Sequence, residues 1–371
     1  MKKIGVLIFW SFAHSIFAQV VNTGLMDTTS GLKIGPVGLT AYVDTYYGYN
    51  FNQPKSKVND YFFAANQHNT FSINLAYLDM QYNGNRVRGR FVPGFGSYMN
   101  ANYAHEKGGF QYIVDASIGV KPLKKKNIWI DAGILGSPYT NESAISKDHL
   151  MYARSLSSEN TPYYLCGVKL SVPINEKWNF YTYLINGWQQ ITDQNNGKSI
   201  GTQVEFRPNK KNLLNWNTYL GDERNSIDTN NRMRYFTDIY WIYKGLKGWD
   251  FTSCAYVGFQ ERFEGLNSIR KYRSWWQANF IARYTWLKTY SVSARMEYFN
   301  DPYEAIIRSV TAQNTFNCMG AGLSFAYRFE DFAMFRIEGR YLQSADRIFM
   351  GTQQNALANE FQCFANLTVW F

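Results

Sequence analysis

Charged residues recur at every second position in several short segments of the chain, and this spacing is the feature that could do chemistry. Arg86, Arg88 and Arg90 alternate with uncharged residues. Successive side chains of a β-strand point to opposite faces, so the three guanidinium groups would share one face. That face cannot lie against lipid, because an arginine at the bilayer midplane costs about 2–4 kcal/mol. The spacing therefore predicts a charged, water-facing surface that could guide ions.

The same alternation assigns other charged residues to the water-facing side. Their mixed signs predict ion pairs between neighbouring strands, which would brace the wall. The set is basic on balance, and rings of Arg and Lys favour anions, so a weak anion preference is a second interpretation of the same residues. The expected pore-lining residues are Arg86, Arg88, Arg90, Asp115, Asp131, Lys169, Arg232, Arg234, Asp238, Arg273, Arg283, Arg295, Glu297, Arg336, Glu338 and Arg340, with Asp44, Glu205, Arg207, Asp250 and Arg328 on the same faces.

The cysteines do not suggest a disulfide framework. They fall on segments that we expect to be strands 6, 11, 14 and 16, and no two of these strands are neighbours. A disulfide needs Cα atoms within about 7 Å. Four free thiols are therefore predicted, at Cys166, Cys254, Cys318 and Cys363.

The histidines do not indicate catalysis or metal binding. His68, His105 and His149 all fall in long connectors. A hydrolase would need a histidine paired with a serine and oriented by a third group, and the sequence fixes no such geometry. The spacing also lacks a close Cys/His pair of the kind that holds zinc. We therefore expect neither an enzyme nor a cofactor.

The first residues predict export. Lys2 and Lys3 precede an apolar run over residues 4–17, and Ala18 ends a plausible cleavage site. The run is shorter than the ~20 apolar residues of a spanning helix. We predict a signal peptide over residues 1–18 and a single barrel domain over residues 19–371. Such a chain is secreted, periplasmic or placed in the outer membrane.

The remainder of the sequence predicts strands. Aromatic residues make up 18% of the chain and mean hydropathy is −0.36, so apolar and polar residues are interleaved. Segments rich in Tyr, Phe, Val, Thr and Trp alternate in polarity with a period of two. We expect sixteen strands, at 39–50, 69–83, 86–92, 109–120, 127–135, 163–173, 177–187, 199–207, 212–222, 231–244, 248–262, 271–286, 289–299, 314–329, 331–343 and 359–371.

The connectors between these strands alternate between short and long. Short periplasmic turns and long external loops are typical of an outer-membrane barrel. Most strands reach the 9–11 residues that cross a bilayer at a tilt, and unpaired backbone groups are not tolerated in lipid, so the sheet must close. The predicted fold is an all-β, antiparallel up-and-down barrel. Two segments fit poorly: Asp79 falls on the outward face unless a bulge lies nearby, and residues 177–187 show no clean face.

The chain resembles the OmpL-like β-barrel porin family of Bacteroidota over nearly all of its mature length. The most specific match is Asn-Gly-Trp followed by an Asn-rich loop. The resemblance implies a porin-like barrel without supplying a substrate. Matching segments are GLTAYVDTYY (38–47), Arg154-Ser155 ahead of Pro162-Tyr163, Asn186-Gly187-Trp188, NNGKSIGTQ (195–203), RMEYFNDP (295–302) and RIEGRYLQSAD (336–346).

The connector over residues 136–162 is the third long loop, and it is long for a connector without a role. General porins fold the loop at this position inward to narrow the pore. An ordinary outward surface loop is the alternative. If the loop constricts the lumen, its charged residues would form the constriction: Glu142, Lys147, Asp148, Arg154 and Glu159.

The last strand alternates in polarity and stops at Phe371. A final strand that ends in phenylalanine resembles the signal read by the barrel-assembly machinery of the outer membrane. We therefore expect Phe371 to act in assembly, with lipid and lipopolysaccharide surrounding the barrel. A homo-oligomer is conceivable by analogy with general porins.

The leading functional hypothesis is an outer-membrane porin for passive diffusion of small hydrophilic solutes. A surface-exposed adhesion or binding barrel and a substrate-specific facilitator are the alternatives, and conductance separates the adhesin from a channel. The net charge of +10 could suggest nucleic acid. However, the basic residues are spread along the whole chain rather than gathered on one face, so no nucleic-acid partner is expected.

Overall fold

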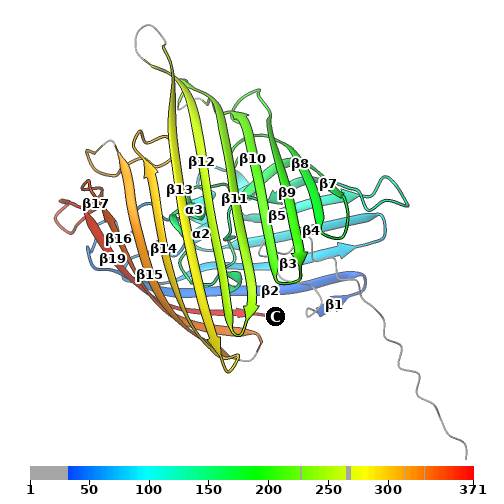
Figure 1. Ribbon diagram of the computed structural model, residues 1–371, viewed down its shortest axis with the longest axis horizontal. Coiled ribbons are helices and arrows are strands. Elements are labelled where there is room, and N and C mark those ends of the chain that lie inside the picture. The colour runs from blue at the N-terminus through cyan, green and yellow to red at the C-terminus, as the bar shows by residue number, and fades with distance from the viewer. Residues whose placement is uncertain (1–31, 226–227, 265–268, 314, 330) are drawn as a thin grey trace, which may run out of the picture.

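The computed structural model describes residues 32–371, except 226–227, 265–268, 314 and 330. Sixteen long antiparallel strands form a closed β-barrel over these residues (Figure 1). They are β2 (Val37–Asn50), β3 (Thr70–Asn83), β4 (Val87–Phe95), β5 (Ile113–Val120), β6 (Trp129–Gly136), β7 (Tyr164–Pro173), β8 (Trp178–Ile185), β9 (Ser199–Asn209), β10 (Asn212–Asp222), β11 (Asn231–Leu246), β12 (Trp249–Glu264), β13 (Ile269–Trp286), β14 (Tyr290–Asp301), β15 (Phe316–Phe329), β16 (Ala333–Ser344) and β19 (Asn359–Trp370). The predicted fold class is confirmed, whereas the predicted signal peptide lies outside the described residues.

The remaining elements are short. A three-residue strand, β1 (Leu32–Ile34), pairs with the start of β2, and β17 (Phe349–Met350) pairs with β18 (Ala356–Leu357) within a loop. Four short helical segments complete the described chain: α2 (Ser97–Asn102), η1 (Gly108–Tyr112), η2 (Ser146–Asp148) and α3 (Leu156–Glu159). None of the helices in the described part of the chain has the length and apolarity to cross a bilayer.

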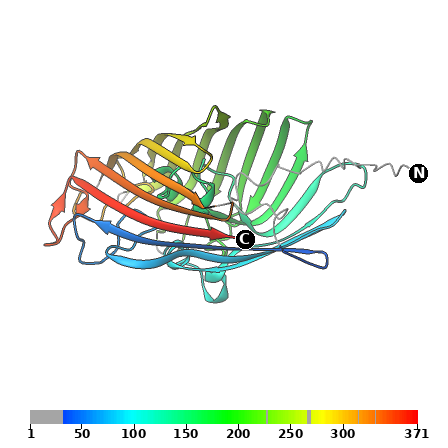
Figure 2. The same ribbon diagram turned by 90° about the horizontal axis from the view of Figure 1, so that it is seen from below.

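The ring closes between the first and the last long strands. β19 pairs with β2 from Gln362↔Asn50 to Trp370↔Tyr42. Beyond that ladder, Ala41 and Phe371 exchange two backbone hydrogen bonds of 2.6 and 3.0 Å. Figure 2 shows the blue and red strands side by side along this seam. Every long strand therefore has two paired neighbours, which satisfies the backbone in lipid.

Short turns gather at one end of the barrel and long loops at the other (Figure 1). The turns include residues 84–86, 121–128, 174–177, 210–211, 247–248, 287–289 and 331–332. One predicted loop is shorter than expected, because β12 and β13 continue to Glu264 and from Ile269. Their hairpin projects above the other strands at the loop end.

The two faces of the wall differ as the alternation requires. Outward side chains are apolar and exposed, as on β15, where Met319, Leu323 and Phe325 point away from the lumen. Inward side chains on most strands are polar and buried, as on β16, where Arg336 and Glu338 point into it. An apolar outer surface with a polar interior is the arrangement of a membrane barrel that encloses water.

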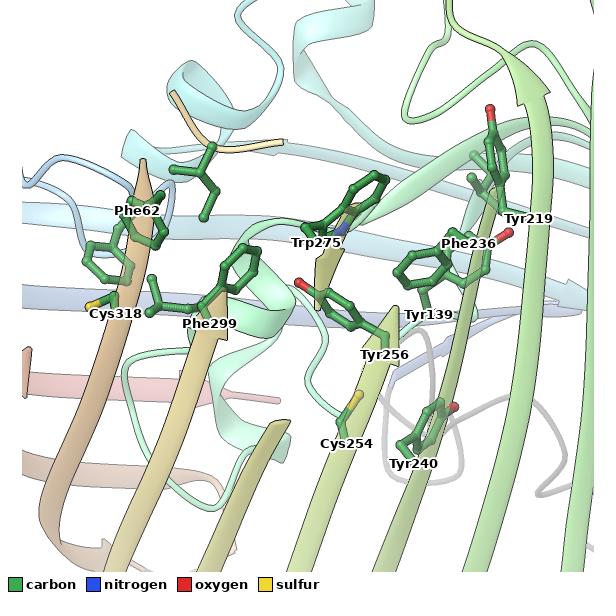
Figure 3. Packing of buried hydrophobic residues seen from close by; sticks show 14 of the residues in the cluster. Phe62, Tyr139, Tyr219, Phe236, Tyr240, Cys254, Tyr256, Trp275, Phe299 and Cys318 are labelled. Carbon is green, nitrogen blue, oxygen red and sulfur yellow. The ribbon is translucent and has the colours of Figure 1, made fainter. Parts of the chain in front are cut away.

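A cluster of rings interrupts the polar lining on one side of the lumen (Figure 3). We call the following residues the aromatic cluster; they come from the inward faces of β10 to β15 and from two loops. Trp275 and Phe299 have no exposed surface. The aromatic cluster comprises Tyr139, Trp188, Tyr219, Phe236, Tyr256, Trp275, Phe299 and Phe316.

Candidate functional site

The loop between β6 and β7, residues 137–163, lies inside the barrel and is called here the inward loop. Its backbone and side chains contact inward faces of strands far away along the ring. Tyr139 contacts β10, Asn141 contacts β12 and β13, and Ser146 contacts β2 and β16. A loop of this length can reach across the lumen, and these contacts hold it there.

Wall carboxylates hold the inward loop by its backbone N–H groups. The N–H of Tyr152 donates to Glu338 Oε2 (2.7 Å), and the N–H of Leu156 donates to Glu297 Oε2 (2.6 Å). On β11, Asp238 Oδ2 accepts the N–H of Thr140 (2.6 Å). Hydrogen bonds to an ionised acceptor are about twice as strong as neutral ones.

Wall donors hold the carbonyl groups of the same loop. Arg336 Nη1 donates to the carbonyl of Ser146 (2.6 Å), and Arg295 Nη1 donates to that of Ala153 (2.5 Å). Ser293 Oγ donates to the carbonyl of Leu150 (2.5 Å). The wall thus binds both the N–H and the carbonyl groups of the inward loop, in the way that a protein binds an extended peptide through its main chain.

The charges of this wall are compensated and buried. Arg295 Nε lies 3.2 Å from Glu297 Oε1, and Arg340 Nη2 lies 3.0 Å from the same oxygen. Arg295 Nη2 is also 3.8 Å from Glu338 Oε1. All four side chains are almost completely inaccessible. A buried charge that loses its partner is strongly destabilising, so this group of residues acts as a unit. We call Arg295, Glu297, Arg336, Glu338 and Arg340 the clasp.

The opposite wall carries charges that pair with each other instead. Arg88 makes a bidentate pair with Asp131, with Nη2 to Oδ2 at 2.5 Å, and Arg90 pairs with Asp79 at 2.6 Å. Lys169 Nζ lies 3.8 Å from Asp131. The arginine side chains remain 17% and 16% exposed. These residues are called the half-exposed wall, and they brace strands β3 to β7.

A bulge explains why Asp79 points inward. The register of β2 against β3 shifts between Asp44↔Leu75 and Thr45↔Ile73, which leaves Asn74 as an extra residue. One extra residue reverses which face the following side chains occupy. Asp79 therefore reaches Arg90, and its outward placement by strict alternation is corrected.

The charged residues predicted for a constriction separate into two groups. Glu142, Arg154 and Glu159 are buried. Glu142 accepts the N–H of Ser155 (2.8 Å), and Glu159 accepts the N–H of Phe63 from the first long loop (2.7 Å). Burial raises the pKa of Glu159, which Arg154 partly offsets.

Arg154 and the Lys147–Asp148 pair have different surroundings. The Arg154 guanidinium lies 4.5 Å from the ring centres of both Tyr98 and Tyr163, and 4.0 Å from Glu159. Lys147 pairs with Asp148 at 2.8 Å, and both side chains retain exposure. Lys147 and Asp148 thus face the remaining space, whereas the buried three hold the inward loop together.

His149 lies beside Asp148 at the deep end of the inward loop and is buried. Its carbonyl accepts a hydrogen bond from Arg283 (3.4 Å), which in turn pairs with Asp250 at 2.6 Å. Burial lowers the pKa of His149 well below the ordinary value, and nearby Arg154 lowers it further. A neutral imidazole therefore belongs to the packed loop.

The other predicted lining residues lie in several places. Asp115 and Arg234 are inward and buried, and Arg234 stacks against Trp188 and Trp275. Two residues at the loop end contact loop groups: Arg232 donates to the carbonyls of Thr229 and Asn231, and Arg273 donates to that of Tyr303. Sequence reasoning had placed both in the lumen.

Two further assignments are corrected at the turn end. Arg86 lies in the turn before β4, where it is exposed and donates to the carbonyls of Lys121 and Pro122. Arg328 is also exposed, at the end of β15, and donates to Asp331. Strand alternation fails for Arg86 because it does not show where a strand begins. Arg328 keeps the inward parity of β15 and lies over the buried Trp370 ring, 5.7 Å from its centre, but at the exposed rim of the barrel.

Two inward carboxylates and the aromatic cluster were missed. Asp301 accepts N–H groups of Ala305, Ile306 and Ile307, and Glu360 accepts from Asn50. Their alternation with apolar residues was a usable signal for Asp301 and Glu360. The aromatic cluster gave none, since apolar residues on both faces hide the period of two.

The cysteine prediction is confirmed. All four are free thiols, with Cys254 and Cys318 buried on inward faces and Cys166 and Cys363 half-buried on outward ones.

Among the residues described by the structure, no group of His, Cys, Asp and Glu could hold a metal ion. Phe371 follows β19 at the turn end, and 63% of its side chain is exposed.

The chain belongs to the family described as "Putative beta-barrel porin-2, OmpL-like", whose model matches residues 36–371. The fold and this match define a porin-like β-barrel of the outer membrane. No curated protein matches the sequence.

Solved porins share the fold at low identity. The outer membrane channel DcaP of Acinetobacter baumannii is similar with a TM-score of 0.61 and 10% identity, covering 92% of this chain and 99% of DcaP. The trimer form of OmpT from Vibrio cholerae gives 0.55 and 11%, covering 91% and 100%. An anion-selective porin from Comamonas acidovorans gives 0.57 and 9%, covering 90% and 99%.

Proposed function

We propose that this protein is a porin that lets small hydrophilic solutes diffuse passively through a lumen narrowed by the inward loop. The observation that carries the proposal is the charged interior of a closed sixteen-stranded barrel, a size that leaves room for water. The clasp holds the inward loop against β14 to β16. Across the lumen from the inward loop lies the half-exposed wall, whose Arg88, Arg90 and Lys169 can remain hydrated.

A weak anion preference is part of the proposal. The inward charges nearly balance once Asp79, Asp301 and Glu360 are included, so the preference does not rest on the wall as a whole. It rests on Arg88 and Arg90, which keep accessible surface, and on unpaired lysines at the turn end. Exposed cations at a pore entrance raise the local concentration of anions.

Conductance in planar bilayers tests the channel. We expect discrete current steps from the purified, refolded protein in KCl. Neutral sugars that are small enough to enter the pore should reduce the current. The size of the smallest sugar that no longer reduces it gives the pore width. A KCl gradient should give a reversal potential of anion-selective sign. A protein that inserts but carries no current, or one that is clearly cation-selective, would contradict the respective parts of the proposal.

Export, insertion and assembly complete the proposal. Residues 1–18 would direct export, and Phe371 would be read by the barrel-assembly machinery, consistent with its exposed position at the turn end. Lipid and lipopolysaccharide would surround the apolar exterior. The trimeric form of the similar OmpT supports a homo-oligomer.

A further inference from the structure

Basic side chains gather at the turn end of the barrel. Thirteen of them lie in or beside the short turns and β1, and all are exposed except the half-buried Lys121. The same segments contain four acidic residues, Glu176, Asp250, Glu330 and Asp331. We call the thirteen the turn-side rim: Lys33, Arg86, Lys121, Lys124, Lys125, Lys126, Lys177, Lys210, Lys211, Lys244, Lys247, Lys288 and Arg328.

The turn-side rim accounts for most of the net charge of the protein. Thirteen basic residues less four acidic ones leave an excess of nine, against a net charge of +10 for the whole chain. The rest of the chain is therefore close to neutral on balance. The pI near 9.2 is thus a local property of one end of the barrel.

Several arginines at the loop end have carboxylate partners, whereas no ion pair is found for the turn-side rim among the described residues. Arg262 pairs with Asp228 (2.6 Å), and Arg270 pairs with Glu261 (2.7 Å). The contacts of the turn-side rim are to main-chain carbonyls, as from Lys211 to Gly245 (3.0 Å). Thirteen cations without carboxylate partners repel each other, so an external anion is favoured.

Apolar side chains stand beside these cations. Leu287 is 78% exposed and precedes Lys288, and Ile174 is 64% exposed three residues before Lys177. Leu123, Leu246 and Phe332 repeat the arrangement at other turns. Tryptophans of the outer face lie next to the turns, at positions 178, 249 and 286. Exposed Leu in water is unfavourable, but Leu with Lys suits the boundary between lipid chains and headgroups.

We propose that the turn-side rim binds anionic phospholipid headgroups of the leaflet that faces the periplasm. The lysines contact lipid phosphate while the adjacent Leu, Ile and Phe side chains enter the acyl layer. A soluble acidic polymer would satisfy the lysines but would leave the apolar side chains in water. This inference rests on the proposed placement in the outer membrane, with the turns toward the periplasm.

Lipid selectivity tests the proposal. The full-length mature protein is reconstituted in mixed phosphatidylglycerol and phosphatidylcholine bilayers, and tryptophan quenching is compared for brominated forms of each lipid. We expect phosphatidylglycerol to be preferred by about threefold or more, because each basic residue near the surface attracts anionic lipid. High salt should reduce the preference.

Two matched variants locate the effect. The test variant removes six rim charges: Lys124→Gln, Lys125→Gln, Lys126→Gln, Lys210→Gln, Lys211→Gln and Lys288→Gln. The control removes six exposed charges at the loop end: Lys55→Gln, Lys57→Gln, Lys107→Gln, Arg270→Gln, Lys271→Gln and Arg308→Gln. The test variant should lose at least half of the preference, and the control should keep it.

Three outcomes would overturn the inference: no preference in the unmodified protein, equal losses in both variants, or retained lipid preference with lost binding to purified peptidoglycan in the test variant. The last would assign the turn-side rim to the cell wall. Conductance of the same samples separates the two proposals. A conducting protein without lipid preference refutes only this inference, whereas a non-conducting one with lipid preference refutes the porin.

Discussion

The clasp and the half-exposed wall follow the same alternation in sequence but do different work. On β4 to β7, Arg88 and Lys169 share Asp131 of β6, and the Arg88 side chain keeps 17% exposure. On β14 to β16, Glu338 and Arg336 reach past their neighbours to main-chain groups of the inward loop. The difference is what lies opposite each wall: water in the first case and a peptide in the second.

An alternating row of charges is therefore not a functional assignment in itself. A strand fixes which side chains enter the lumen, but the loop that fills the lumen decides whether those charges meet solvent, each other or backbone. Buried charges with exact partners are costly to disturb, whereas exposed ones contribute little to stability. The two walls should thus respond very differently to the same kind of substitution.

Glu338→Gln should have the largest effect. It removes the negative charge that accepts the N–H of Tyr152 and lies beside Arg295. Breaking a buried charge pair costs about 3–5 kcal/mol, so the inward loop should leave the wall. Single-channel conductance should rise, and a membrane-impermeant thiol reagent should reach Cys254, whose Sγ lies 3.8 Å from Ser157 Oγ.

Glu205→Gln is the matched control for that substitution. Glu205 is also an inward, buried carboxylate, but it pairs with Arg207 on its own strand and does not contact the inward loop. Labelling is measured with Cys166, Cys318 and Cys363 replaced by alanine. Equal conductance and equal labelling in both variants would show that the clasp does not hold the loop.

Acidification should also release the inward loop from the wall, but to a smaller extent than Glu338→Gln. Burial lowers the pKa of His149 in the packed loop, so the released loop binds a proton more readily. The equilibrium between the packed and the released loop is thus unaffected above the ordinary histidine pKa of about 6.5. Below that pH, the equilibrium constant for packing falls by up to about tenfold per pH unit. Cys254 labelling should increase from pH 7.5 to 5.5.

His149→Gln should abolish the increase in Cys254 labelling on acidification. Glu159 contributes in the opposite direction, because its raised pKa makes the packed loop more favourable as pH falls. The difference between the unmodified protein and the variant isolates the histidine. Identical pH profiles for the two would rule out His149 as the responsive group.

Arg88→Gln should have the smallest effect on structure. Arg88 keeps 17% exposure, and Lys169 remains near Asp131 after the substitution, so the buried carboxylate still has a cation beside it. We expect unchanged conductance and Cys254 labelling, with a reversal potential shifted by a few millivolts toward cation selectivity. A large change in labelling would mean that the two walls are coupled.

Most of the barrel could be predicted because one rule, the period of two, acts on every strand. Strict alternation failed at Asp79, where the extra residue Asn74 changes parity; a carboxylate on the lipid-facing side indicated a bulge, but the sequence did not show its position. It also gave no clear face for residues 177–187. There Tyr181, Tyr183 and Ile185 of β8 face inward and pack in the lumen, so both faces are apolar.

The path of the inward loop could not be predicted in the same way. Its length indicated a role, but its contacts join groups that are distant in sequence, such as Tyr152 and Glu338, 186 residues apart. No local pattern encodes such a pairing. The rings of the aromatic cluster are likewise placed by packing between loops and strands, which depends on the closed barrel already being present.

The seam between β2 and β19 gives the protein an all-or-none dependence on chain length. Asn366 donates to Asp44 across 322 residues (2.6 Å). The first long strand, β2, therefore has a second paired neighbour only once the last strand has been made. A chain that ends early leaves two bare edges, which lipid does not tolerate. Truncation should therefore give degraded or aggregated product and never a smaller pore, and selection against premature stops should extend to the final codons.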